Sequence, residues 1–258
     1  MTTTLRAITL ERHGRAATLT LHRPPLNVLD LDALAGLGEA IAALAGDPEL
    51  TLVFLCGAGP RAFSAGTAVQ DHAPDRIAAM LAAIHGAVRA LQALPAITVA
   101  AVHGLCLGGG MEIAMSCDLV IATEDARFGQ PEVDLGCFPP VAAALYPARL
   151  GAARTLALLL SGGPLSAAEA ERQGLVQRLL PAGGLAAGCR ALEEELAGKS
   201  APVLRLIKRA VAAGCRLPPG EALAECERLY LEELAPLADM REGVAAFLAK
   251  RRPEWQHR

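Results

Sequence analysis

The sequence predicts an α/β fold, and two features of the chain indicate it. Up to about residue 200, short apolar runs alternate with longer segments in which apolar residues recur at helical spacing. From Leu185 onward, every segment has the helical pattern. Alternating strands and helices are typical of a layered α/β domain. We therefore predict an α/β core at residues 1–200 and an all-helical region at residues 201–258.

The expected elements follow from periodicity and from the residues that end each run. A hairpin of strands 8–13 and 17–21 stops at Arg23-Pro24-Pro25, and a helix at 30–45 stops at Gly46-Asp47-Pro48. Asp30 or Asp32 is placed to cap that helix, and Ser166 with Glu169 forms a capping box. Further strands are expected at 51–56, 98–102, 119–122 and 176–180, and loops at 57–66 and 103–110. Further helices are expected at 74–94, 111–116, 141–150, 152–160, 166–173, 185–199, 202–213, 221–234 and 238–250.

The composition limits where the protein can work. Of 258 residues, 53% are hydrophobic but only 3% aromatic, so the core must be built from Ala, Leu, Val and Ile. No run reaches the roughly 18 uninterrupted apolar residues of a membrane span, and the first residues lack a secretory signal pattern. We expect a cytoplasmic protein without membrane contact. Its mean hydropathy of +0.35 favours apolar surface buried between subunits.

Charge and cysteine usage exclude several classes. The net charge is −3 and no basic block is present, which argues against nucleic acid as a partner. The seven cysteines are odd in number and never spaced as Cys-x-x-Cys. This pattern favours reduced thiols over a disulfide framework or a zinc site. We expect neither a metal nor a redox cofactor, because no ligand cluster has suitable spacing.

Two glycine-containing segments follow predicted strands. Phe63-Ser64-Ala65-Gly66-Thr67 would let a ligand approach the backbone closely, although for this segment taken alone an ordinary strand-to-loop turn is the better explanation. Gly108-Gly109-Gly110 opens the helix that carries Glu112. Free N–H groups at a helix start can hold a phosphate or a developing oxyanion. The spacing matches neither a dinucleotide-binding fingerprint nor a Walker loop.

Glu112 and Glu132 both lie among apolar residues. Desolvation in such surroundings raises the pKa of a carboxyl group, which suits proton transfer near neutral pH. The alternative is a pair of structural carboxylates. Composition alone does not decide between the two interpretations.

Taken together and in order, these segments resemble the crotonase family of enoyl-CoA hydratases and isomerases. Each motif alone is weak, and their order and spacing carry the resemblance. The matching stretches are Leu-His-Arg-Pro-Pro-Leu-Asn (21–27), Phe-Ser-Ala-Gly (63–66), Val-His-Gly-Leu-Cys-Leu-Gly-Gly-Gly-Met-Glu (102–112), Cys-Asp-Leu-Val-Ile-Ala (117–122), Phe-Gly-Gln-Pro-Glu (128–132) and the terminal segment 243–251.

The resemblance implies a fold and a mechanism. The expected fold is a crotonase spiral of ββα units at residues 1–200 with a C-terminal helical trimerisation region at 201–258, giving a trimer or a dimer of trimers. The backbone N–H groups of Thr67 and Gly109 would form an oxyanion hole for the thioester carbonyl. Glu112 would activate water for attack at Cβ, and Glu132 would deliver a proton to Cα.

The resemblance also implies where the substrate lies. Coenzyme A, as part of an acyl-CoA thioester and not as a separate cofactor, would run along Pro25, Leu26, Val28, Ala65 and Val69. Phe247 and Lys250 match positions that reach the CoA of a neighbouring subunit. A helix face used for packing and solvation explains these two residues about as well.

Two departures from the family pattern bear on the acyl group. Thr67-Ala68-Val69 replaces the common Ala-Asp continuation, and Pro140 replaces a glycine whose N–H helps to hold the attacking water. Together with 71–75 and 230–234, the pocket segment Phe138-Pro139-Pro140 resembles a subgroup acting on rings, the cyclohexa-1,5-diene-1-carbonyl-CoA hydratases. His72 is expected to be a surface or supporting residue.

Three functions stay open at this point. The leading hypothesis is an enoyl-CoA hydratase-type lyase that favours a cyclic dienoyl-CoA. The second is a double-bond isomerase or acyl-CoA hydrolase on the same scaffold, since one fold hosts many chemistries. The third is a CoA-binding or RNA-associated protein without turnover, against which two intact glutamates and the lack of a basic stripe both count.

Overall fold

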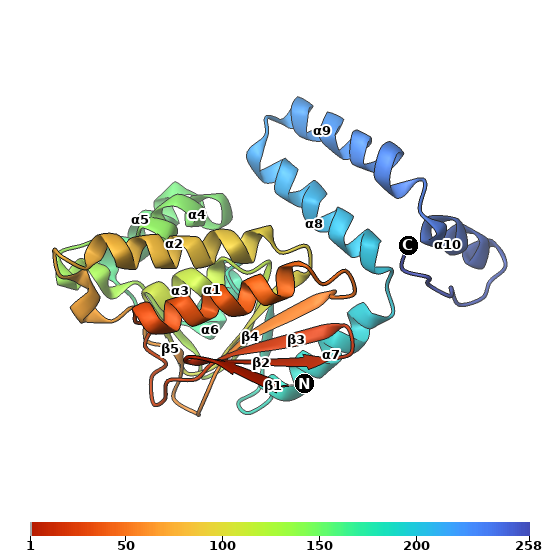
Figure 1. Cartoon of the computed structure of the whole chain (residues 1–258). Helices are drawn as coiled ribbons and strands as arrows, with labels where there is room; N and C mark the ends of the chain where they lie inside the picture. The colour runs from red at the N-terminus through yellow and green to blue at the C-terminus, as the bar shows by residue number, and fades with distance from the viewer. Residues whose placement is uncertain (1) are drawn as a thin grey trace.

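A computed structural model describes residues 2–258, and the chain divides visibly into a layered body and a projecting arm (Figure 1). We use "body" for residues 2–200 and "arm" for residues 201–258. Two sheets and the first seven α-helices make up the body, whereas the arm is entirely helical. The chain ends beside α10 and turns back toward the start of α8, where the N–H of Ala201 donates to Nδ1 of His257 (Figure 1).

The larger sheet has seven strands in the order β1-β2-β3-β4-β6-β8-β11. β1, β2 and β3 pair antiparallel, and every later pair, from β3 with β4 to β8 with β11, is parallel. The strands are β1 (Thr2–Leu5), β2 (Ile8–His13), β3 (Ala16–Leu21), β4 (Leu52–Gly57), β6 (Ile97–Val102), β8 (Leu119–Thr123) and β11 (Arg178–Leu180).

The smaller sheet has four short strands in the order β10-β9-β7-β5. They are β5 (Ala62–Ser64), β7 (Leu105–Leu107), β9 (Arg127–Gly129) and β10 (Leu165–Ser166). β5, β7 and β9 each come directly after a strand of the larger sheet and before a helix, so the same β-β-α turn occurs three times. This repetition confirms the predicted crotonase-type spiral.

The helices of the body connect these strands. They are α1 (Leu31–Ala45), α2 (Ile77–Ala93), α3 (Gly109–Met115), α4 (Pro140–Leu150), α5 (Ala152–Ser161), α6 (Ala167–Arg172) and α7 (Leu185–Ala197), with 3-10 turns η1 (Val69–His72) and η2 (Pro131–Leu135). Two predicted caps are confirmed: the side chains of Asp30 and Ser166 accept from the N–H groups of Ala33 and Glu169. The loop expected at 103–110 contains β7 and the start of α3.

Both faces of the larger sheet are covered. Val53 and Leu55 of β4 face the main core beneath α1 and α2, while Leu52 and Phe54 face a second cluster that includes Leu192 of α7. Successive side chains of a strand point to opposite faces, so a strand buried on both sides must be apolar throughout. The buried core is aliphatic, as the composition predicts.

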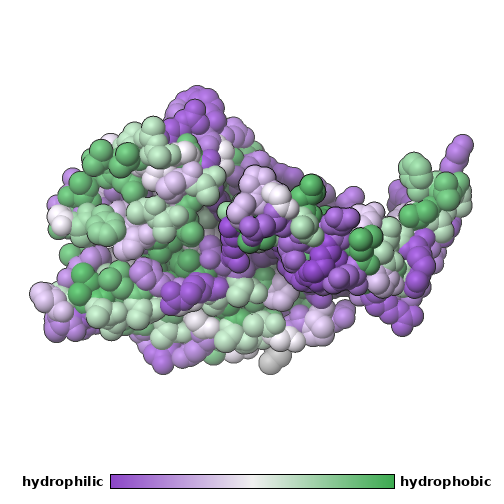
Figure 2. Space-filling model, turned by 90° about the horizontal axis from the view of Figure 1, so that it is seen from above, coloured by the Kyte–Doolittle hydropathy of each residue, from purple (hydrophilic) through white to green (hydrophobic). Residues whose placement is uncertain are grey.

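The arm consists of α8 (Ala201–Arg216), α9 (Pro219–Arg228), a π-helical turn η3 (Leu229–Leu234) and α10 (Ala238–Leu248). It exposes many large apolar side chains, and Figure 2 shows hydrophobic residues gathered at its outer end. Its terminal segment is nevertheless well fixed. The buried carboxylate of Asp239 accepts from the N–H groups of Gln256 and His257. Trp255 packs against Gly243, and its Nε1 donates to the Gly198 carbonyl at 2.8 Å.

Candidate active site

Glu112 lies on α3, in a place that the preceding glycines make possible. Gly108 has a φ of +51°, a backbone conformation that favours glycine. A Cβ at this position would lie 2.8 Å from Oε1 of Glu132. The turn into α3 therefore brings the backbone against the second glutamate, which has room only because residue 108 lacks a side chain.

The two carboxyl groups share one buried site. Glu112 is 4% exposed and Glu132, in η2, is 8% exposed. Burial raises the pKa of Glu112 to about 7, with a further increase from the charge of Glu132. Burial also raises the pKa of Glu132. The low exposure of both side chains confirms the desolvation expected from the apolar sequence around them, and the two carboxyl groups line the same hollow.

The N-terminus of α4 holds Glu112 in place. The N–H of Ala142 donates to Oε1 of Glu112 at 3.0 Å, and the N–H of Val141 also lowers the pKa of this carboxyl group. Pro140 is the first residue of α4, where its missing N–H costs no helical hydrogen bond. The N–H groups of Val141 and Ala142, one and two residues later, point at Glu112 and stabilise its ionised form.

Two main-chain N–H groups lie close together beside the glutamates. A Cβ built on Gly109 would lie 3.3 Å from the nitrogen of Thr67, and one built on Gly66 would lie 3.4 Å from the nitrogen of Gly109. Among residues 2–258, neither N–H donates to another group of the chain. The position of Gly109 at the start of α3 adds partial positive charge. Such a pair can donate to a carbonyl oxygen of a ligand.

Two polar residues that the sequence analysis did not single out support this loop. Asn27 is fully buried, and its Nδ2 donates to the carbonyls of Ala58 and Ala62. The Ser64 hydroxyl donates to the Asn27 carbonyl and accepts from the N–H of Gly66. They join the segment 21–27 to the segment 63–66, although both motifs were visible in the sequence only as separate stretches.

The glutamates line a hollow of about 160 Å³ with a mostly apolar wall. Phe138, Pro139 and Pro140 lie in this wall, as does Thr67. His72 lines it too, and its Nδ1 lies 3.2 Å from the Ala68 carbonyl. A carbonyl can only accept, so Nδ1 is the donor in this contact. The remaining lining residues are Ile77, Met80, Leu81, Ile84, Glu112, Glu132 and Cys137.

Other predicted binding residues lie outside this hollow. Pro25 is exposed, Leu26 and Val28 are half-buried, and the N–H of Ala65 donates to the Leu26 carbonyl. Val69 is exposed on η1. Phe247 and Lys250 lie at the end of the arm, and neither lines the hollow of its own chain.

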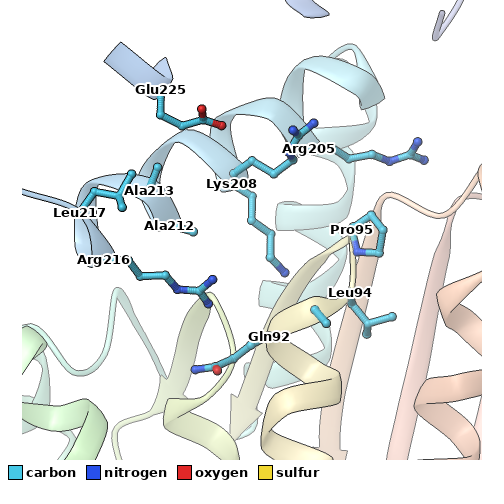
Figure 3. A pocket seen from close by; sticks show the side chains of 12 residues that line it. Gln92, Leu94, Pro95, Arg205, Lys208, Ala212, Ala213, Arg216, Leu217 and Glu225 are labelled. Atoms are coloured by element: carbon cyan, nitrogen blue, oxygen red, sulfur yellow. The ribbon is translucent and has the colours of Figure 1, made fainter. Parts of the chain in front are cut away.

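A larger hollow of about 450 Å³ lies between α8 and the end of α2 (Figure 3). Three of the four basic side chains in its lining are already engaged by the protein. Lys208 pairs with Asp118, Arg209 pairs with Glu233, and Arg205 donates to the carbonyl of Leu50. The only acidic residue in its lining is Glu225, which pairs with Arg228. It contains no acid–base pair, so the smaller hollow is the candidate active site.

Neither a metal site nor a membrane-spanning helix is found in residues 2–258. No group of three or more His, Cys, Asp or Glu side chains is arranged to hold a metal ion. No helix in this range has both the length and the apolar character needed to cross a membrane.

Comparison with known proteins agrees with the fold. The family model described as enoyl-CoA hydratase/isomerase matches residues 11–258. A Thauera aromatica protein named cyclohexa-1,5-dienecarbonyl-CoA hydratase is 41% identical, covering 96% of each chain. A probable enoyl-CoA hydratase of Mycobacterium bovis is 37% identical, covering 99% of this chain and 100% of the relative.

The solved structures lead to the same fold. An enoyl-CoA hydratase from Geobacillus kaustophilus aligns with a TM-score of 0.94 at 26% identity, covering 100% of this chain and 99% of that one. Pseudomonas aeruginosa DspI aligns with a TM-score of 0.90 at 32% identity, covering 97% of each. The chain therefore belongs to the enoyl-CoA hydratase/isomerase family, the crotonases. Within that family it is an enoyl-CoA hydratase-like hydro-lyase.

Proposed function

We propose that this enzyme hydrates a cyclic dienoyl-CoA thioester, with cyclohexa-1,5-diene-1-carbonyl-CoA as the favoured substrate. Glu112 takes a proton from water as the oxygen attacks Cβ, and Glu132 gives a proton to Cα. The N–H groups of Thr67 and Gly109 donate to the thioester oxygen while negative charge develops on it. No metal or redox cofactor takes part in this scheme.

The size and chemistry of the hollow carry the proposal. An apolar cavity of about 150 Å³ engineered into another protein takes up benzene. The hollow here measures about 160 Å³ and has aliphatic, proline and phenylalanine walls. A six-membered ring fits such a volume, whereas a long acyl chain does not. The 41% identical Thauera aromatica relative, whose name includes a ring diene, supports the same substrate.

The arm supplies the second part of the proposal. Phe247 is 83% exposed and Leu248 is 75% exposed, which is unusual for large apolar side chains unless another surface covers them. We place them against a second copy of the chain, in a trimer or a dimer of trimers. There, Phe247 and Lys250 reach the CoA bound along Pro25, Leu26, Val28, Ala65 and Val69 of the neighbour. The cysteine pattern supports a cytoplasmic location.

The test is a comparison of two substrates with purified protein. Hydration of crotonyl-CoA and of cyclohexa-1,5-diene-1-carbonyl-CoA is measured for the wild type, Glu112→Ala and Glu132→Ala. We expect faster turnover of the diene, lowered about 10³-fold in each variant because a general acid or base is lost. Faster turnover of crotonyl-CoA would overturn the ring substrate. Hydrolysis of the thioester bond or movement of the double bond, with no addition of water to the double bond, would overturn hydration.

A further inference from the structure

A buried chain of hydrogen bonds runs behind Glu132. The side-chain amide of Gln130 lies between the hydroxyl of Tyr146 and the carboxyl group of Glu132, and both Gln130 and Tyr146 are 0% exposed. The distance from the amide to the Tyr146 Oη is 2.7 Å. No other polar partner of the Tyr146 hydroxyl is found among residues 2–258.

The Gln130 amide is satisfied at both ends in one orientation. Nε2 donates to the Glu132 oxygens at 3.1 and 3.3 Å, while Oε1 accepts from the Tyr146 hydroxyl. A half-turn would point Oε1 at the Glu132 carboxyl group and would leave acceptors facing each other. The first orientation fits both forms of Glu132, because the carboxylate accepts with either oxygen and the neutral acid still accepts with its carbonyl oxygen.

The Tyr146 hydroxyl selects this orientation of the amide by donating to Oε1 of Gln130. Burial raises the pKa of Tyr146, as do the charges of Glu112 and Glu132 and the thiol of Cys106, so the hydroxyl keeps its proton. Cys137 is the other titratable group beside Glu132. Tyr146 also lies on α4, one helical turn after Ala142, whose N–H holds Glu112. One helix therefore contacts the surroundings of both carboxyl groups.

We propose that Tyr146 is a positioning residue for Glu132 and acts through Gln130. The Tyr146 hydroxyl keeps the Gln130 amide turned so that Nε2 points at Glu132. When the O–H bond of Glu132 breaks and the Cα–H bond of the product forms, the new carboxylate accepts from Nε2. Glu132 is thereby held at the same place in both protonation states. The inference rests on the proposed role of Glu132 as the acid of the hydration.

The variants Tyr146→Phe and Gln130→Met test this, alone and together. Turnover is followed against pH with whichever of the two thioesters the wild type hydrates faster. We expect kcat to fall about 10-fold in each single variant, with KM unchanged because CoA is bound elsewhere. Because Tyr146 acts through Gln130, the double variant falls no further than Gln130→Met.

The pH profile distinguishes positioning from packing. Glu132 must hold a proton to deliver it, so activity declines above the upper apparent pKa of the carboxyl pair. When the N–H of Gln130 no longer points at Glu132, the ionised carboxylate is less stable and the pKa of Glu132 rises. The alkaline limb of the profile therefore moves to higher pH by about one unit. Tyr230→Phe makes the same chemical change at the half-exposed tyrosine of the arm, and it should leave the profile at the wild-type position.

Three results would overturn the proposal. They are wild-type kcat in Tyr146→Phe, losses in the double variant that multiply, and a fall in kcat that tracks a lower Tm without a shift of the alkaline limb. Failure of the proposed hydration is separately visible, because the wild type itself would then hydrate neither thioester, and failure of the ring substrate alone would show as faster hydration of crotonyl-CoA.

Discussion

The body and the arm differ in how far their side chains are buried and find partners within one chain. Around the candidate site, Glu112, Gln130 and Tyr146 are nearly or fully buried and have partners within the body. The arm exposes apolar residues on all three of its helices, among them Ile207, Leu223 and Phe247, each more than half exposed. The polar groups around the candidate site thus have their partners within a single chain, whereas each helix of the arm carries large apolar side chains that a single chain does not cover.

This difference separates chemistry from assembly. The acid–base pair and the paired N–H groups need only residues of the body, because α3, α4 and η2 place them. The predicted CoA contacts of Phe247 and Lys250 need a second chain. Substitutions in the body should therefore alter proton transfer and stability, and substitutions in the arm should alter association and binding. Three predictions test this division, in order of decreasing effect.

The largest effect is expected at Glu112, where function and stability oppose each other. Its pKa is raised from 4.5 to about 7 by burial. The neutral acid therefore stabilises the fold at low pH, and this contribution disappears as the pH rises through about 7. Glu112→Gln, neutral at every pH, should be more stable than the wild type by about 3 kcal/mol at pH 8, and equally stable near pH 4.

Urea unfolding at the two pH values measures this gain. Glu227→Gln, at an exposed glutamate of the arm, is the matched control and should change stability at neither pH. Equal stability of Glu112→Gln and the wild type at pH 8 would contradict the prediction. Such a result would mean that Glu112 ionises at no cost to folding.

The second prediction concerns the end of the arm. Replacing Phe247 and Leu248 by serine removes two large apolar side chains from the surface that we assign to a neighbouring subunit. Burying one such side chain contributes about 1.5–3 kcal/mol. Self-association should weaken at least 30-fold, about 2 kcal/mol, as measured by light scattering over a dilution series. Leu160→Ser, at a similarly exposed leucine of the body, should leave the molar mass unchanged. If the serine double variant and Leu160→Ser had the same molar mass across the dilution series, association would not depend on the end of the arm.

The smallest effect is expected where the arm meets the body. Lys208 of α8 donates to the Ala96 carbonyl and pairs with Asp118 at 2.7 Å. Asp118 also accepts from the N–H and hydroxyl of Thr98, so it keeps partners when Lys208 is lost. Lys208→Met should therefore cost about 1 kcal/mol of unfolding free energy. Arg209→Met removes a more exposed ion pair within the arm and should cost less. A larger loss of unfolding free energy in Arg209→Met than in Lys208→Met would contradict this ranking.

The long elements of the fold could be predicted because their periods extend over many residues. The helix at 31–45 has its cap at Asp30, and its buried positions recur at helical spacing. The smaller sheet was missed, since two or three residues show no measurable period. The segment 105–107 lies within a glycine-rich stretch and forms a strand because β5 and β9 pair with it. Such strands arise from tertiary pairing.

The candidate site was predictable where a residue carried its own signal. Glu112 and Glu132 were identified because charged side chains are unusual in apolar runs. Ala142 could not be identified, because it contributes a backbone N–H and its side chain is irrelevant. Gln130 and Tyr146 are separated by 16 positions, and only the folding of α4 over η2 places them in contact. Sequence indicated the acids but not the groups that hold them.

One further consequence concerns Trp255. It is the single tryptophan of the chain, and it lies on the arm, against Gly243 and hydrogen-bonded to Gly198. The intrinsic tryptophan fluorescence of this protein therefore originates entirely outside the layered body. Its emission should respond when the arm loosens or docks, and should be insensitive to events at the carboxyl pair. The molecule thus has a built-in optical label on one of its two parts, and no dye has to be attached.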